Sequence, residues 1–145
     1  MADVKIKVRA IQRSSIMKYD IKKIADDAHI YAITVDKLIS EYDYYDLKNE
    51  AFELIEAFEE VSFVVDLEAL SYLNSSGLNL LIQLLTKTRN SKGETVIINV
   101  SNQIDNLLIV TKIKSLFLTF STKEEAVGYL KSQKENTADL EQLNT

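Results

Sequence analysis

Two short, almost wholly apolar runs constrain the fold more than any other feature of the sequence. The runs "VSFVVDL" (61–67) and "ETVIINV" (94–100) are rich in β-branched residues and lack the polar alternation of a strand with one wet face. Such runs are typical of strands buried on both faces of a parallel sheet. The segment between them has helical periodicity over about 76–91, as a crossover connection requires. The sequence therefore predicts an α/β fold with a parallel core.

The flanking segments extend this alternation. Residues 17–24 and 30–35 surround the polar turn "ADDAH" and predict an antiparallel hairpin. Apolar spacing and capping residues predict three more helices, at 44–58, at 101–113 and from Thr122 onward. A further short strand is predicted at 115–120. The order β-β-α-β-α-β-α-β-α predicts a single α/β domain, with a mixed, mostly parallel sheet, an N-terminal hairpin and about four helices.

The two ends of the chain differ from this pattern. The opening "DVKIKVRAI" alternates apolar and basic residues, which indicates either an edge strand or a flexible arm with strand potential. Beyond about Lys134 the chain is polar and aperiodic, so we expect a frayed or disordered tail over 134–145.

Composition argues against several function classes. The net charge is −5, from 17 basic and 22 acidic residues. Apart from the mixed start "VKIKVRAIQR", the basic residues are scattered rather than clustered as a nucleic-acid surface requires. There is no cysteine for a disulfide or thiolate metal site. No apolar run approaches the length of a membrane span, and no secretory signal is evident, so a cytoplasmic protein without membrane insertion is expected.

Catalysis has little support in the sequence. The chain has one histidine, His29, in the context "DDAHIY", where a structural or solvated role is expected. We see no paired acid and base, no metal cluster and no glycine-rich phosphate cradle. The sequence therefore predicts no enzyme, no cofactor and no metal, and an enzyme or nucleotide-binding module is the least supported reading.

The stretch "SYLNSSGLNLL" (71–81) places Ser75, Ser76 and Gly77 where a buried strand gives way to a helix. In parallel sheets the carboxyl edge of the strands is where functional loops collect. A phosphate on a serine there would lie against free first-turn amides and would present negative charge to a partner. The structural alternative is equally concrete, because Asn74 or Ser75 is an ordinary N-cap and Gly77 permits tight packing.

The following helix has more leucine than one core face needs. Leu78, Leu81, Ile82 and Leu85 form one face by themselves, which leaves Leu80 and Leu84 on its flank. The two extra leucines indicate either an apolar contact patch or burial under a neighbouring element. Gly93, at the far end, suits a left-handed residue just past the helix C-terminus.

From Val64 to Leu130 the sequence resembles the STAS domains of bacterial anti-sigma factor antagonists. The shared features are an apolar strand, an Asp-Leu pair, a Ser-Ser-Gly-Leu stop that opens a helix, and a terminal "EEA" helix. The resemblance is traceable back to Met17. It implies a STAS domain over 17–133, preceded by an extension or a mis-assigned start at 1–16.

The resemblance also implies a function. In that family the unmodified antagonist binds an anti-sigma factor that is a serine kinase, and the kinase phosphorylates the first motif serine. A PP2C-type phosphatase reverses the modification. The matching serine is Ser75, with Ser76 as second choice. The partner-facing residues implied here are Asn74, Ser75, Ser76, Gly77, Leu80, Leu84, Ile39 and Ser40.

The sequence departs from the family motif at two positions. Asn74 stands where the family has aspartate, and Ile39 or Ser40 stands where a loop aspartate is expected. These departures keep a second reading open, in which the chain is a STAS scaffold that is never phosphorylated. Such a scaffold would serve as the regulatory subunit of a transporter ATPase or of a stressosome-like assembly. The sequence leaves the oligomeric state open.

Overall fold

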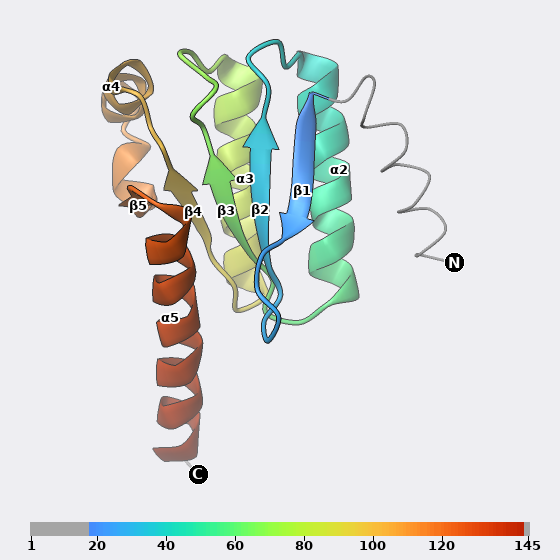
Figure 1. Cartoon of the computed structure of the whole chain (residues 1–145), viewed down its shortest axis with the longest axis vertical. Helices are drawn as coiled ribbons and strands as arrows, with labels where there is room; N and C mark the ends of the chain where they lie inside the picture. The colour runs from blue at the N-terminus through green and yellow to red at the C-terminus, as the bar shows by residue number, and fades with distance from the viewer. Residues whose placement is uncertain (1–17, 144–145) are drawn as a thin grey trace.

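The structure, a computed structural model, describes residues 18–143, with side chains as far as residue 134. Five strands form one sheet in the order in which they occur in the chain. The strands are β1 (Tyr19–Lys23), β2 (Ile30–Val35), β3 (Ser62–Asp66), β4 (Thr95–Ile98) and β5 (Thr119–Phe120). The helices are α2 (Glu41–Ala57), α3 (Ser75–Asn90), α4 (Asn102–Val110) and α5 (Lys123–Leu143), with a 3₁₀ turn, η1 (Lys114–Leu116). Figure 1 shows their arrangement.

The sheet is mixed, as the sequence predicts. β1 and β2 pair antiparallel as a hairpin, while β2, β3, β4 and β5 run parallel to one another. Helices connect the parallel strands, which is the usual form of such a crossover. The predicted α/β class and the N-terminal hairpin are therefore confirmed.

One face of the sheet carries the larger core. Ile33, Val65 and Ile97 are aligned across three strands and lie in one buried cluster with α2, α3 and α4. α2 contributes to this cluster the buried side chains Tyr44, Leu47, Ala51 and Ile55. Their i, i+3, i+4 spacing is the reason why this segment is an amphipathic helix.

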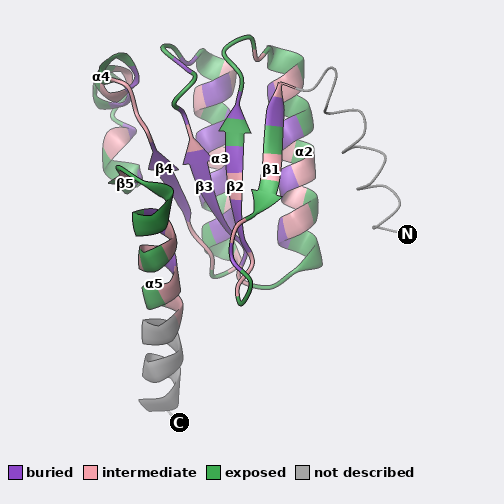
Figure 2. Cartoon of the chain, in the orientation of Figure 1, coloured by how far each residue is buried: buried purple, intermediate pink, exposed green. Residues whose placement is uncertain are grey.

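The opposite face is covered mainly by α5. Val64 and Val96 are aligned across β3 and β4 and lie in a second cluster with Ala126 and Leu130 of α5. Because side chains alternate along a strand, burial on both faces requires apolar residues at successive positions. Figure 2 shows β3 and β4 buried along most of their length.

The C-terminal part of the chain differs from expectation in two respects. Residues 114–116 form the 3₁₀ turn, and only Thr119 and Phe120 pair with β4, so the predicted strand 115–120 is largely wrong. α5 continues to Leu143, so helical backbone replaces the frayed or disordered tail expected beyond Lys134. The sequence "KENTADLEQL" contains no Gly or Pro and is rich in helix-forming residues, which accounts for the continuation. The predicted N-terminal extension or arm at 1–16 lies outside the described residues.

α3 ends in a Schellman motif that corrects the expected role of Gly93. The left-handed residue is Lys92, with φ of 66°, and the Lys92 amide donates to the Arg89 carbonyl. The Gly93 amide donates to the Thr88 carbonyl at 2.7 Å, which completes the motif. Gly93 itself does not have a positive φ. It is needed for space, because a Cβ at this position would lie 1.8 Å from the Val61 carbonyl oxygen.

Candidate functional site

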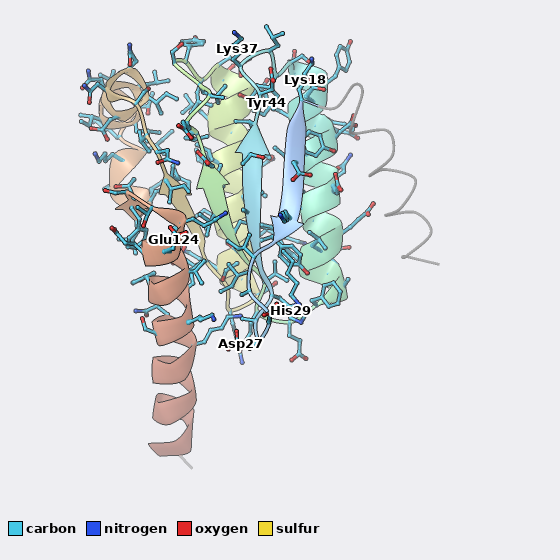
Figure 3. The ribbon with its side chains drawn as sticks, viewed as in Figure 1. Lys18, Asp27, His29, Lys37, Tyr44 and Glu124 are labelled. Atoms are coloured by element: carbon cyan, nitrogen blue, oxygen red, sulfur yellow. The ribbon has the colours of Figure 1, made fainter. Side chains whose placement is uncertain are left out.

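The candidate site lies at the carboxyl edge of the parallel strands. The β2–α2 loop and the β3–α3 loop both leave the sheet at this edge, at the top of the domain in Figure 1. Lys37 and Tyr44 mark this end in Figure 3, whereas Asp27 and His29 lie at the opposite end. The fold therefore brings together the two loops that the sequence singled out.

At the β3–α3 junction, Asn74 is the N-cap of α3. Its side-chain oxygen accepts from the Gly77 amide at 2.9 Å, so one of the two predicted caps is confirmed. Ser75 is exposed and Ser76 is half-buried. Gly77 is buried, and a Cβ there would lie 2.8 Å from Leu73 and 3.0 Å from the Tyr44 ring. The glycine thus allows the buried Tyr44 to pack beneath the serines.

The electrostatic setting of Ser75 favours an anion. The first turn of α3 has no acidic residue, while Lys87 and Arg89 stand in its last turn. The helix dipole places partial positive charge at the Ser75 end, and an acidic residue there would have competed with a phosphate. A phosphoserine at position 75 is therefore compatible with the folded domain.

The β2–α2 loop gives its two predicted residues structural positions. Ser40 is the N-cap of α2 in a full capping box, with its amide donating to the Asp43 carboxylate at 2.8 Å. Ile39 is half-buried and packs against the main core. The most exposed apolar side chain of this loop is Leu38, at 66% exposure. Partner contact by Ile39 and Ser40 stays a prediction.

Of the two interpretations of Leu80 and Leu84, burial under a neighbouring element is confirmed and the apolar contact patch is wrong. Leu80 and Leu84 are 5% and 0% exposed and lie in the main core, whereas Leu78 and Ile82 are only half-buried. α3 packs beside α2, with Lys87 of α3 contacting Glu56 of α2 at 3.6 Å. α2 covers the side of α3 that carries Leu80 and Leu84. The buried face of α3 is therefore rotated about the helix axis from the face expected from Leu78, Leu81, Ile82 and Leu85.

Tyrosines form an exposed aromatic surface near the site, which the sequence alone leaves open as either an interface or the start of a helix. Tyr42, Tyr45 and Tyr72 are 85%, 60% and 69% exposed, and all three stand in or near the two loops of the site. Their signal was present in "EYDYYDL", where helical spacing places Tyr42 and Tyr45 on one side and Tyr44 toward the core. Burial raises the pKa of the Tyr44 phenol above its usual value.

A cleft of about 170 Å³ opens between α2 and α3 beside Ser76. It is lined from α2 by Glu41, Tyr44, Tyr45 and Lys48, and from α3 by Ser76, Asn79, Leu80 and Gln83. The Lys48 ammonium lies 5.0 Å from the centre of the Tyr45 ring. The cleft thus has a buried floor and charged and amide-bearing walls.

His29 is remote from this site and has a packing role. Its ring stacks on Phe58 with centroids 4.5 Å apart, and its buried Nδ1 has no hydrogen-bond partner. Among the described residues, no group of three or more His, Cys, Asp or Glu side chains could hold a metal ion. Within the same part of the chain, no helix combines the length and apolarity needed to cross a bilayer.

Comparison with known proteins assigns the family. Residues 21–126 match the STAS domain, and because this match covers most of the chain, the protein belongs to the STAS domain family. The matched residues lie inside the predicted domain at 17–133 and contain both loops of the site.

Solved structures share the fold at low identity. The anti-sigma factor antagonist SpoIIAA in its unphosphorylated form aligns with a TM-score of 0.69 and 15% identity, over 79% of this chain and 96% of its own. A putative anti-sigma factor antagonist from Thermotoga maritima aligns with a TM-score of 0.68 and 16% identity, over 78% and 94%. The murine anion transporter Slc26a9 aligns with a TM-score of 0.61 and 11% identity, over 87% of this chain but 24% of its own.

Proposed function

We propose that this protein is an anti-sigma factor antagonist that binds a serine-kinase anti-sigma factor and is switched off by phosphorylation of Ser75. The observation that carries the proposal is the exposure of Ser75 on the first turn of α3, with Asn74 supplying the cap. The serine is thus accessible without participating in the fold. The role is one of regulated binding, not of catalysis.

The proposed switch is electrostatic. The kinase transfers the γ-phosphoryl group of ATP to the Ser75 hydroxyl oxygen, releasing ADP and a proton, and a PP2C-type phosphatase returns the serine by hydrolysis. The phosphate adds about two negative charges at pH 7. In a desolvated interface an unpaired charge costs several kcal/mol, which is enough to release the partner.

Intact-mass measurement of the protein purified from its native cells tests the proposal. We expect one phosphate-sized adduct that is absent from a Ser75→Ala variant and is still present in Ser76→Ala. An adduct that persists in Ser75→Ala and disappears in Ser76→Ala would move the switch by one residue. An unmodified mass under both growth and stress would contradict the switch.

A second candidate is a STAS scaffold that is never phosphorylated. It is favoured by the likeness in fold to Slc26a9 and to a sulfate transporter family protein from Wolinella succinogenes, the latter with a TM-score of 0.60 and 13% identity. Asn74 in place of the motif aspartate also favours it. In this case the domain would regulate a transporter or a larger assembly through the same edge, and no adduct would form.

A further inference from the structure

We propose that the cleft between α2 and α3 is a specificity pocket that receives one arginine side chain of the protein partner. The inference rests on the proposed function, because it places the partner at the same edge as Ser75. It adds the chemical nature of a partner group and the residues of this chain that select it. Ser76 lines the cleft, so a partner docked over the serines would cover its mouth.

The size of the cleft suits a side chain rather than a metabolite. Its volume is about 170 Å³, whereas pockets for small molecules usually measure about 300–1,000 Å³. The floor is apolar, since Tyr44 and Leu80 are 6% and 5% exposed. Such a floor accommodates the methylene stem of a long side chain, with the polar head held at the walls.

The walls suit a planar cation. Glu41 offers a carboxylate, and Asn79 and Gln83 offer amide oxygens. The Lys48 ammonium lies 5.0 Å from the centre of the Tyr45 ring, so an incoming guanidinium would have to displace this flexible side chain to stack on the ring. A guanidinium can donate to the carboxylate in a bidentate manner and stack on an aromatic ring, whereas an ammonium acts as a point charge.

The charge around the cleft favours a basic partner surface. The charged residues that line the cleft are Glu41 and Lys48. Asp43 and Asp46 stand outside the lining on the same two turns of α2, so these turns carry more acidic than basic residues. Tyr42 and Tyr45 project from the same turns at high exposure. Tyrosine and arginine are enriched at the points of interfaces where binding energy concentrates. The partner that fits is therefore a protein with a protruding arginine in a basic surface.

Calorimetric binding to each serine-kinase anti-sigma factor of the source genome, purified separately, tests the inference. For the kinase that binds the native chain, we expect Glu41→Gln and Tyr45→Ala each to weaken binding about 5- to 30-fold. Tyr45→Phe, which keeps the ring, should stay within about twofold. Leu118→Ala is the matched control, because Leu118 is a 43% exposed apolar residue outside the cleft lining.

The partner side supplies the sharper result. Surface arginines of that kinase are changed to alanine one at a time, and each variant is combined with Glu41→Gln in a double-mutant cycle. For one arginine, the effects of the two changes on the binding free energy should be non-additive. Thermal unfolding of each variant separates loss of binding from loss of fold.

Three outcomes would overturn the inference. Unchanged affinity for folded Glu41→Gln and Tyr45→Ala would remove the pocket and leave the proposed function standing. Failure of every kinase to bind the native chain would remove the proposed function, and the inference with it. A dimer of this chain in sedimentation that Tyr45→Ala dissociates would make a second copy the occupant.

Discussion

The two ends of α3 each carry a glycine, and the two glycines are needed for different reasons. At the start of the helix, the atoms that a Cβ on Gly77 would meet are the outer atoms of Leu73 and Tyr44, which can move. At the far end, a Cβ on Gly93 would meet the backbone carbonyl of Val61, the residue directly before the central strand β3. The N-terminal end of α3, which carries Ser75 and Ser76 and is called the serine end below, is therefore packed by side chains that can adjust. The C-terminal end is packed against backbone atoms, which cannot adjust in the same way.

This difference is consistent with the proposed function, in which only the N-terminal end of α3 carries the modified serine. An end that exchanges partners and accepts a phosphate must tolerate small shifts of its side chains. An end that anchors the helix to β3 and β4 must not move. Substitutions at the two ends should therefore differ in cost, and four of them test the comparison.

Gly93→Ala is expected to have the largest effect, at least about 3 kcal/mol of lost unfolding free energy. The new Cβ would lie 1.8 Å from the Val61 oxygen, so backbone must shift. Chemical denaturation measures the loss. Gly128→Ala is the control, because a Cβ there meets nothing within 4 Å, and it should stabilise α5 by up to about 1 kcal/mol. A cost below about 1 kcal/mol for Gly93→Ala would break the comparison.

Thr88→Val should cost about 1–3 kcal/mol. The Thr88 and Thr95 hydroxyls lie 2.9 Å apart and both residues are buried, so valine leaves the Thr95 hydroxyl without this partner. Thr86→Val is matched to it, because the exposed Thr86 hydroxyl donates only to the Ile82 carbonyl. We expect that control to change stability by less than about 0.5 kcal/mol. Equal costs in thermal unfolding would show that this end of α3 is not specially fixed.

Asn74→Ala should cost about 1 kcal/mol through loss of the N-cap. Asn74→Asp restores the residue that the resemblance places there and should lie within a few tenths of a kcal/mol of the native chain, because aspartate caps equally well. Urea unfolding of the three proteins checks the order. A large loss in Asn74→Asp would mean that Asn74 does more than cap the helix.

Gly77→Ala should have the smallest effect, below about 1 kcal/mol. Movement of Leu73 and Tyr44 costs packing energy, but alanine regains up to about 1 kcal/mol of helix propensity relative to glycine. Unfolding measured beside Gly93→Ala sharpens the comparison directly. A cost equal to that of Gly93→Ala would show that the serine end is as fixed as the other.

Local patterns predicted most of the fold. The runs 61–67 and 94–100 could be assigned as buried strands because burial on both faces removes polar residues from a strand. The hairpin and the cap of α3 followed from equally local signals, a polar turn and an Asn before a helical run. These features depend on residues that are close in sequence.

The errors concern contacts made by distant segments. Whether Leu80 and Leu84 are exposed depends on how α2 lies beside α3, and the helical pattern of α3 alone admits either answer. The requirement for Gly93 comes from Val61, which is 32 positions earlier in the chain. In the segment expected as a strand, only Thr119 and Phe120 pair with β4, and this pairing with a distant strand is not evident from the local pattern. The cleft beside Ser76 likewise needs two helices to exist.

The agreement between strand order and chain order bears on how the domain folds. Each neighbouring pair of strands is also consecutive in sequence. No strand has to be inserted into a gap between two strands that are already paired, so loop closure involves only one connection at a time. We expect the sheet to grow outward from the β1–β2 hairpin as the chain leaves the ribosome. The serine loop would then take its place before α5 has been synthesised.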